Sequence, residues 1–171
     1  MEERYSRLGF SVFSGIGPKR FRHLLDHFGS AKNAWEGDES QLKEILGKVY
    51  GDAFIDFRRS FSPEIYAHTL QAHDVWFVTT EDAFYPKLLR ESAVPPIVLY
   101  GKGEQEVLAS TISVFVGVVG TRRISSYGRE VTQSLTSSLV SSGCVIVSGL
   151  AMGVDAEAHT TTIDLGGQTI A

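Results

Sequence analysis

The sequence contains a single cysteine, Cys144, and no apolar run long enough to cross a membrane. A lone cysteine excludes an intrachain disulfide, and its apolar neighbours at 145–147 favour a buried structural thiol over a reactive one. The apolar run 114–120 is far shorter than the ~20 residues that a bilayer requires. A basic stretch followed by an apolar one, which marks a secretion signal, is also lacking. We therefore expect a cytoplasmic protein without membrane association.

Excess positive charge is lacking as well. The 171 residues include 16 lysines and arginines against 20 aspartates and glutamates, a net charge of −4. This balance excludes a protein that coats nucleic acid through uniform basicity. It leaves room for a local basic site, because binding depends on where the charges lie.

Residues 1–73 carry a helical pattern interrupted by short breakers. Apolar side chains recur three and four positions apart, for example at Phe21, Leu24 and Phe28, which is the spacing of one helix face. Glycine-containing breakers and a Ser-Pro step at Ser62 separate such stretches. The pattern predicts a small all-helical domain of about four or five short helices.

The first breaker, Gly15-Ile-Gly-Pro18, resembles the turn of a helix-hairpin-helix motif. In that motif the turn and the next helix N-terminus bind a DNA phosphate without reading sequence, which agrees with the attraction of anions to helix ends. Lys19 and Arg20 place positive charge there. Such turns also serve purely in helix packing or protein contacts, so both uses stay open.

Residues 74–110 change from a helical to an extended pattern. The segment 75–79 is rich in residues that favour strands, and the Pro-Pro pair at Pro95 forces an extended chain into 97–100. We interpret residues 74–110 as a connector that adds short strands to the next domain.

Strand and helix patterns alternate over residues 111–171. The order is strand 112–119, helix 125–142 with an apolar stripe at Tyr127, Val131, Leu135 and Leu139, strand 145–147, helix 154–165 and strand 168–171. This order predicts a parallel sheet with right-handed crossovers. A doubly wound sheet usually has about five or six strands, so we expect a chain that belongs to a longer protein. The predicted fold class is α/β, a small N-terminal all-helical domain followed by an incomplete Rossmann-like parallel sheet.

The turn after the first predicted strand has the features of an anion site. In an open parallel sheet, ligands bind beyond the carboxyl ends of the strands, where helix N-termini offer free N–H groups. Gly120 permits close approach of the backbone, and Thr121 and Ser125 offer hydroxyl groups. Arg122 and Arg123 add guanidinium groups, which suit phosphate. A tight strand-to-helix turn with solvated arginines is the alternative.

The turn after the second predicted strand begins with Ser148 and Gly149. It lies beside the first turn in a parallel sheet, so the two predict one groove lined by backbone N–H groups, hydroxyls and Arg122. Neither turn has the spacing G-x-G-x-x-G, and no acidic residue follows the strand to bind a ribose. We therefore expect no dinucleotide cofactor.

Asp155 and His159 lie four residues apart on one face of a predicted helix. A metal site needs more ligands, and a catalytic Asp–His pair needs a nucleophile, for which Ser148 is the nearby candidate. We favour the simpler interpretation that Asp155 complements the helix N-terminus and His159 packs beside it.

Several motifs occur in one order along the chain. They are Tyr85-Pro-x-x-Leu88, Pro95-Pro-Ile-Val-Leu-Tyr100-Gly-Lys-Gly103, Val119-Gly-Thr-Arg122 with Tyr127-Gly128, Ser148-Gly-Leu-Ala-x-Gly-Val-Asp155 with Ala158-His159, and Gly166-Gly-x-Thr-Ile170. Together they resemble the DNA-processing protein A family (DprA/Smf) over residues 84–171, although Val154 stands where isoleucine is common. The N-terminal helices suit that family's small helical domain more loosely.

The resemblance implies a non-catalytic homodimer that binds single-stranded DNA in natural transformation, protects it and loads the RecA recombinase. From residues and resemblance together, the expected DNA contacts are Gly120, Thr121, Arg122, Arg123, Ser125, Ser148, Gly149, Lys19 and Arg20. One alternative is a nucleotide-binding or nucleoside-monophosphate-hydrolysing protein on a similar fold, although the Pro-Gly-Gly-x-Gly-Thr turn of such hydrolases does not occur here. Another is that the N-terminal helices serve only in protein interaction.

Overall fold

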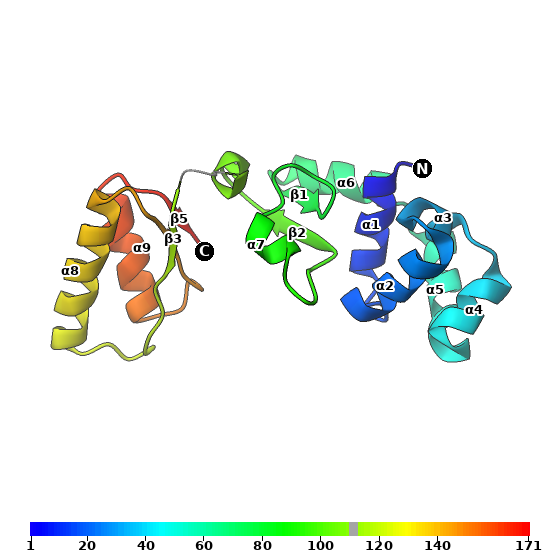
Figure 1. Cartoon of the computed structure of the whole chain (residues 1–171), viewed down its shortest axis with the longest axis horizontal. Coiled ribbons are helices and arrows are strands. Elements are labelled where there is room, and N and C mark those ends of the chain that lie inside the picture. Colours follow the sequence, from blue (N-terminus) through cyan, green and yellow to red (C-terminus); the bar gives the residue numbers. More distant parts are fainter. Residues whose placement is uncertain (110–112) are drawn as a thin grey trace. The chain divides into compact units, whose positions relative to one another are not determined.

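The structure is a computed structural model that describes residues 1–109 and 113–171. The chain divides into two compact units, Met1–Ala109 and Ser110–Ala171 (Figure 1). Each has its own secondary structure. The first unit is mostly helical, and the second combines helices with a parallel sheet.

Six consecutive helices begin the first unit. They are α1 (Glu3–Val12), α2 (Pro18–Phe28), α3 (Ala31–Glu36), α4 (Glu39–Leu46), α5 (Lys48–Ser60) and α6 (Pro63–Ala72). Side chains cap three of them, because Ser30, Asp38 and Ser62 each accept a hydrogen bond from a backbone N–H in the first turn. Gly29 ends α2 in the left-handed conformation, with φ at 77°. The first 73 residues are thus helical as the pattern predicted, with six helices where four or five were expected.

Aromatic rings fill the core of this helical part. The ring of Phe10 stacks on that of Phe54 with centroids 5.0 Å apart and meets the edge of Trp35 at 5.3 Å. Phe10 and Phe54 are fully buried. Aromatic pairs in such geometry stabilise a core beyond the area that they bury.

Two short strands complete the first unit, with α7 (Lys87–Arg90) between them and the 3₁₀ helix η1 (Gln105–Ala109) after them. Strands β1 (Trp76–Thr79) and β2 (Val98–Gly101) are antiparallel partners. We expected these strands to extend the sheet of the next domain. In the described residues they pair with each other instead, because Phe77, Ile97 and Val98 bury their side chains in the helical core.

The second unit contains the parallel sheet. Its elements are β3 (Phe115–Gly117), α8 (Ser126–Ser141), β4 (Val145–Val147), α9 (Val154–Asp164) and β5 (Thr169–Ile170). The strands lie in the order β3-β4-β5, and Figure 1 labels β3 and β5 together with both helices. Val145 and Ile146 of the central strand are buried, while Cys144 is only half-buried. The predicted α/β fold class and the strand–helix order are confirmed. The predicted first strand, 112–119, begins at a residue outside the described residues, and β3 covers only Phe115–Gly117 of it.

The turns after β3 and β4 as a candidate nucleic-acid interface

The turn between β3 and α8 is held by its own hydroxyl groups. The Oγ of Ser125 accepts a hydrogen bond from the Gly128 N–H at 3.1 Å and so caps α8. The Oγ1 of Thr121 accepts from the Arg123 N–H at 3.1 Å. The sequence suggested that these hydroxyls face a ligand. In the structure both already have partners within the turn.

The turn between β4 and α9 is also held by internal hydrogen bonds. Ser148 is buried, and its Oγ donates to the Val118 carbonyl oxygen at 2.7 Å. The Gly149 N–H donates to Oδ2 of Asp155 at 3.2 Å. Ser148 and Gly149 therefore fix the shape of this turn and leave few polar groups of their own for a ligand.

The two turns touch each other, as their places in the sheet predicted. The Val154 N–H donates to the Thr121 carbonyl oxygen at 3.1 Å. A Cβ on Gly120 would lie 2.6 Å from Cγ2 of Val154, and a Cβ on Gly153 would overlap the Thr121 carbonyl oxygen. These glycines let one turn pack on the other. The sequence had suggested that Gly120 serves close approach to a ligand.

Unpaired donors remain on this surface. Arg122 and Arg123 are exposed, and neither guanidinium group has a hydrogen bond or ion pair with another described residue. The backbone N–H groups of residues 120–122 and 150–153 likewise have no acceptor in the part of the chain that the structure describes. Backbone N–H groups and guanidinium groups at the carboxyl end of a parallel sheet are the surroundings that phosphate prefers.

A nearby ion pair removes another cation from this surface. Arg129 on α8 pairs with Glu157 on α9, and the Gln133 Nε2 donates to the same carboxylate at 2.6 Å. The side chain of Glu157 is buried, with 8% exposed. The sequence did not predict this interaction, because Glu157 lies on a different helix from Arg129 and Gln133 and is not related to them by a local spacing.

Asp155 and His159 do not act as a pair. Asp155 is bonded to Gly149, while Nδ1 of His159 lies 2.7 Å from Oγ1 of Thr169. The buried Nε2 of His159 has no hydrogen-bond partner among the described residues. No cluster of three or more His, Cys, Asp or Glu side chains suited to a metal ion occurs in that part of the chain.

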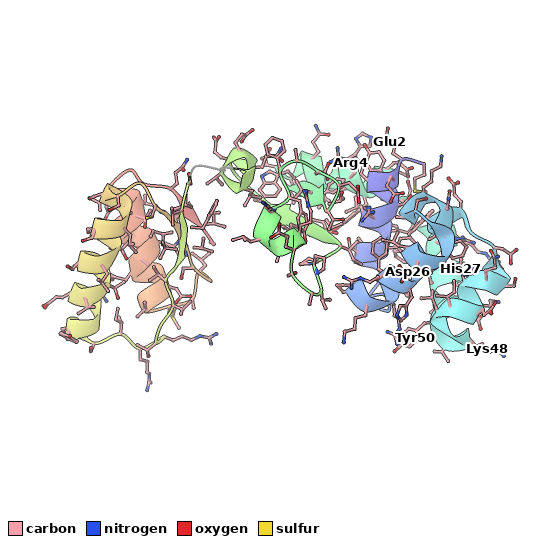
Figure 2. The ribbon with its side chains drawn as sticks, in the orientation of Figure 1. Glu2, Arg4, Asp26, His27, Lys48 and Tyr50 are labelled. Atoms are coloured by element: carbon pink, nitrogen blue, oxygen red, sulfur yellow. The ribbon has the colours of Figure 1, made fainter. Side chains whose placement is uncertain are left out.

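The helix-hairpin-helix-like turn belongs to the first unit. The Arg20 guanidinium donates to the Gly15 carbonyl oxygen at 3.0 Å and lies 3.9 Å from the ring centroid of Tyr50, a residue labelled in Figure 2. Ile16, within this turn, is buried. Lys19 is exposed and has no bonded partner within the described ranges. Of the two cationic side chains predicted to contact DNA here, Arg20 stabilises the turn by its hydrogen bond to Gly15, whereas Lys19 is free to contact a ligand.

A protein-family model described as DNA recombination-mediator protein A matches residues 76–171. The chain belongs to this family, DprA/Smf. The family predicted from the motifs is thereby confirmed. Both turns of this DprA/Smf chain fall inside the matched residues, whereas Lys19 and Arg20 fall outside them.

Known DprA/Smf proteins resemble the chain to different extents. Protein Smf of Synechocystis sp. is 36% identical over 167 residues, which are 96% of this chain and 42% of that protein. The DNA processing protein DprA of Bacillus subtilis is 41% identical over 86 residues, 50% of this chain and 28% of that protein. The chain thus spans less than half of the length of either relative.

A solved structure supports the fold. The X-ray structure of DprA from Streptococcus pneumoniae matches all of this chain and 57% of the chain in that structure, with a TM-score of 0.74 and 24% sequence identity.

Among the described helices of this DprA/Smf chain, none has the length and apolar character needed to cross a membrane.

Proposed function

We propose that the protein binds single-stranded DNA at the two turns that follow β3 and β4. The observation that carries the proposal is the group of unpaired donors there, the exposed Arg122 and Arg123 beside backbone N–H groups without acceptors in the described residues. Membership of a family whose proteins are named for DNA processing supports it.

The contacts divide into two kinds. Arg122, Arg123 and the N–H groups of Gly120 and Thr121 contact phosphates, because they lack protein partners in the described residues. Ser125, Ser148 and Gly149 act indirectly by fixing the turns. Phosphate contacts carry no sequence information, so binding is largely sequence-independent and weakens with salt.

The proposed role of this site is binding without catalysis. The nucleophile that the sequence offered is Ser148, whose hydroxyl donates a hydrogen bond to the Val118 carbonyl oxygen. Nδ1 of His159 is hydrogen-bonded to Oγ1 of Thr169. For the protein as a whole we extend the proposal to a cytoplasmic homodimer that protects incoming single-stranded DNA in natural transformation and transfers it to the RecA recombinase. This extension rests on family membership.

The test is a fluorescence-anisotropy titration of labelled oligothymidine with the full-length protein at low and moderate salt. Double-stranded DNA and Arg122→Ala are the controls. We expect tight, salt-sensitive binding of the single strand that Arg122→Ala weakens. Absence of binding at low salt would reject the proposal, and nucleoside monophosphates would then be the ligands to screen.

A further inference from the structure

Three large apolar side chains are exposed on the same two turns. The exposed fraction is 80% for Val119, 66% for Leu150 and 76% for Met152. Single exposed apolar residues are ordinary on protein surfaces. Three of them on contacting turns, beside unpaired arginines, mark a surface that combines apolar and cationic groups.

The backbone holds Leu150 in an unfavourable conformation. Its φ is 53°, in the left-handed region, which penalises residues with a side chain. The loop around it is fixed by hydrogen bonds from Gly149 to Asp155 and from Val154 to Thr121. Strain of this kind persists where surrounding structure imposes it, and it occurs most often at functional sites.

Met152 is adjacent to the proposed phosphate contacts. It precedes Gly153, where a Cβ would lie 2.8 Å from Cα of Arg122. The backbone that carries Met152 therefore abuts the backbone that carries Arg122. A ligand bound by the arginine has an apolar surface next to its phosphate.

We propose that Leu150 and Met152 contact the unstacked bases of the strand whose phosphates are bound by Arg122 and the turn N–H groups. This inference rests on the proposed DNA binding and adds the part of the ligand that selects single strands. A single strand exposes the apolar faces of its bases, whereas a duplex buries them in its stack. Aliphatic and thioether side chains fit any base face, so the contact is independent of sequence.

The test compares two single-stranded ligands of equal length, oligothymidine and an abasic strand with the same phosphates. The variants of the full-length protein are Leu150→Gly, Met152→Ala and both together. Leu135→Ala is the matched control, because Leu135 is also exposed, at 61%, but lies in the middle of α8. Leu150→Gly relieves the left-handed backbone, so we expect no fall in Tm.

We expect the double variant to bind oligothymidine about tenfold more weakly, the effect of uncovering roughly one large apolar side chain. Binding to the abasic strand, the salt dependence and the Leu135→Ala control should stay at wild-type values. Met152→Ala alone, at a position with an ordinary φ, should show part of the same selective loss.

Each other outcome has one meaning. The base contact would be overturned if the double variant bound oligothymidine as tightly as the wild-type protein does. It would also be overturned if the wild-type protein bound oligothymidine and the abasic strand equally well, or if the double variant lost the same affinity for both strands. Wild-type protein that binds neither strand would instead reject the DNA-binding function itself.

Discussion

The carbonyl oxygen of Thr121 accepts a hydrogen bond from the backbone N–H of Val154 at 3.1 Å. This bond joins the turn after β3 to the first residue of α9, so the two turns form one continuous surface. Gly153 lies at the same contact, where a side chain would overlap the Thr121 carbonyl oxygen. The geometry of the proposed phosphate site therefore depends on a contact between two backbones.

Replacing Gly153 tests this dependence. Gly153 and Gly143 both have positive φ, 90° and 77°, but a Cβ on Gly143 meets no atom within 4 Å. We expect Gly143→Ala to cost about 1–2 kcal/mol for its left-handed backbone alone. Gly153→Ala should cost more in urea denaturation, because its φ of 90° and ψ of −124° suit glycine alone and because its Cβ would overlap the Thr121 carbonyl oxygen, and it should also weaken DNA binding. Equal losses of stability would show that the contact between the turns matters little.

Ser125 separates helix capping from DNA binding. Its Oγ caps α8 by accepting from the Gly128 N–H, so Ser125→Ala should cost about 1 kcal/mol of stability. Ser125→Asp keeps the cap and adds a negative charge that favours the helix N-terminus but repels phosphate. We expect Ser125→Asp to unfold like wild type and to bind single-stranded DNA more weakly. Wild-type DNA affinity in Ser125→Asp would place the strand away from α8.

The two proposed basic sites should contribute unequally to the affinity for single-stranded DNA. Arg122 lies among unpaired N–H groups inside the residues that the family model matches, while Lys19 lies outside them. We expect Arg122→Ala to weaken oligothymidine binding more than Lys19→Ala does, and to reduce the log–log salt slope by about 0.7 for each phosphate that is no longer neutralised. Titrations at several salt concentrations measure both effects. Equal or reversed reductions in affinity would contradict this ranking.

The sequence predicted the order of elements but not every buried face. The apolar stripe of the helix 125–142 includes Tyr127 and Leu135, yet both are exposed, and Thr132 and Thr136 are buried instead. Periodicity shows that a helix has an apolar face, but the element that covers a face depends on tertiary packing. Here α8 packs against α9.

At the candidate site, the sequence predicted the contact between the two turns but not the hydrogen bonds that individual side chains make there. Both turns and their contact followed from the parallel order of the strands. The role of Ser148 did not, since its hydroxyl bonds to Val118, 30 residues away. Such a pairing leaves no local pattern. The exposure of Leu150 and Met152 did have a sequence signal, because two large apolar residues stand between the glycines of a turn.

Asp38 gives a prediction on pH. Hydrogen bonds from the hydroxyl and the backbone N–H of Ser40 hold the pKa of the Asp38 carboxyl below its ordinary value of 3.8. Because the folded pKa is depressed, the stabilisation by this group is fully present above that ordinary value. That stabilisation is lost as the pH falls through the folded pKa. NMR titration of the carboxyl should show the low pKa, and Ser40→Ala should raise it; an unchanged pKa in Ser40→Ala would contradict the cause.

The ion pair between Arg129 and Glu157 gives a prediction about charge burial. The side chain of Arg129 is 54% exposed, whereas that of Glu157 is 8% exposed. Arg129→Met removes the cation and leaves the carboxylate buried with the Gln133 amide as its donor. Half of the pair is solvated, so we expect a loss of about 2 kcal/mol, less than for a fully buried pair.

The double variant Arg129→Met with Glu157→Gln distinguishes two causes of the lost stability, an unpaired buried carboxylate and weakened packing. If the buried carboxylate is what destabilises Arg129→Met, neutralising it should recover part of the stability, and the two single changes will not add. Urea denaturation of the four proteins in the cycle measures this coupling. Additive effects would mean that Arg129 stabilises the α8–α9 contact through its aliphatic stem and not through its charge, because the stem packs equally in the presence and absence of the carboxylate.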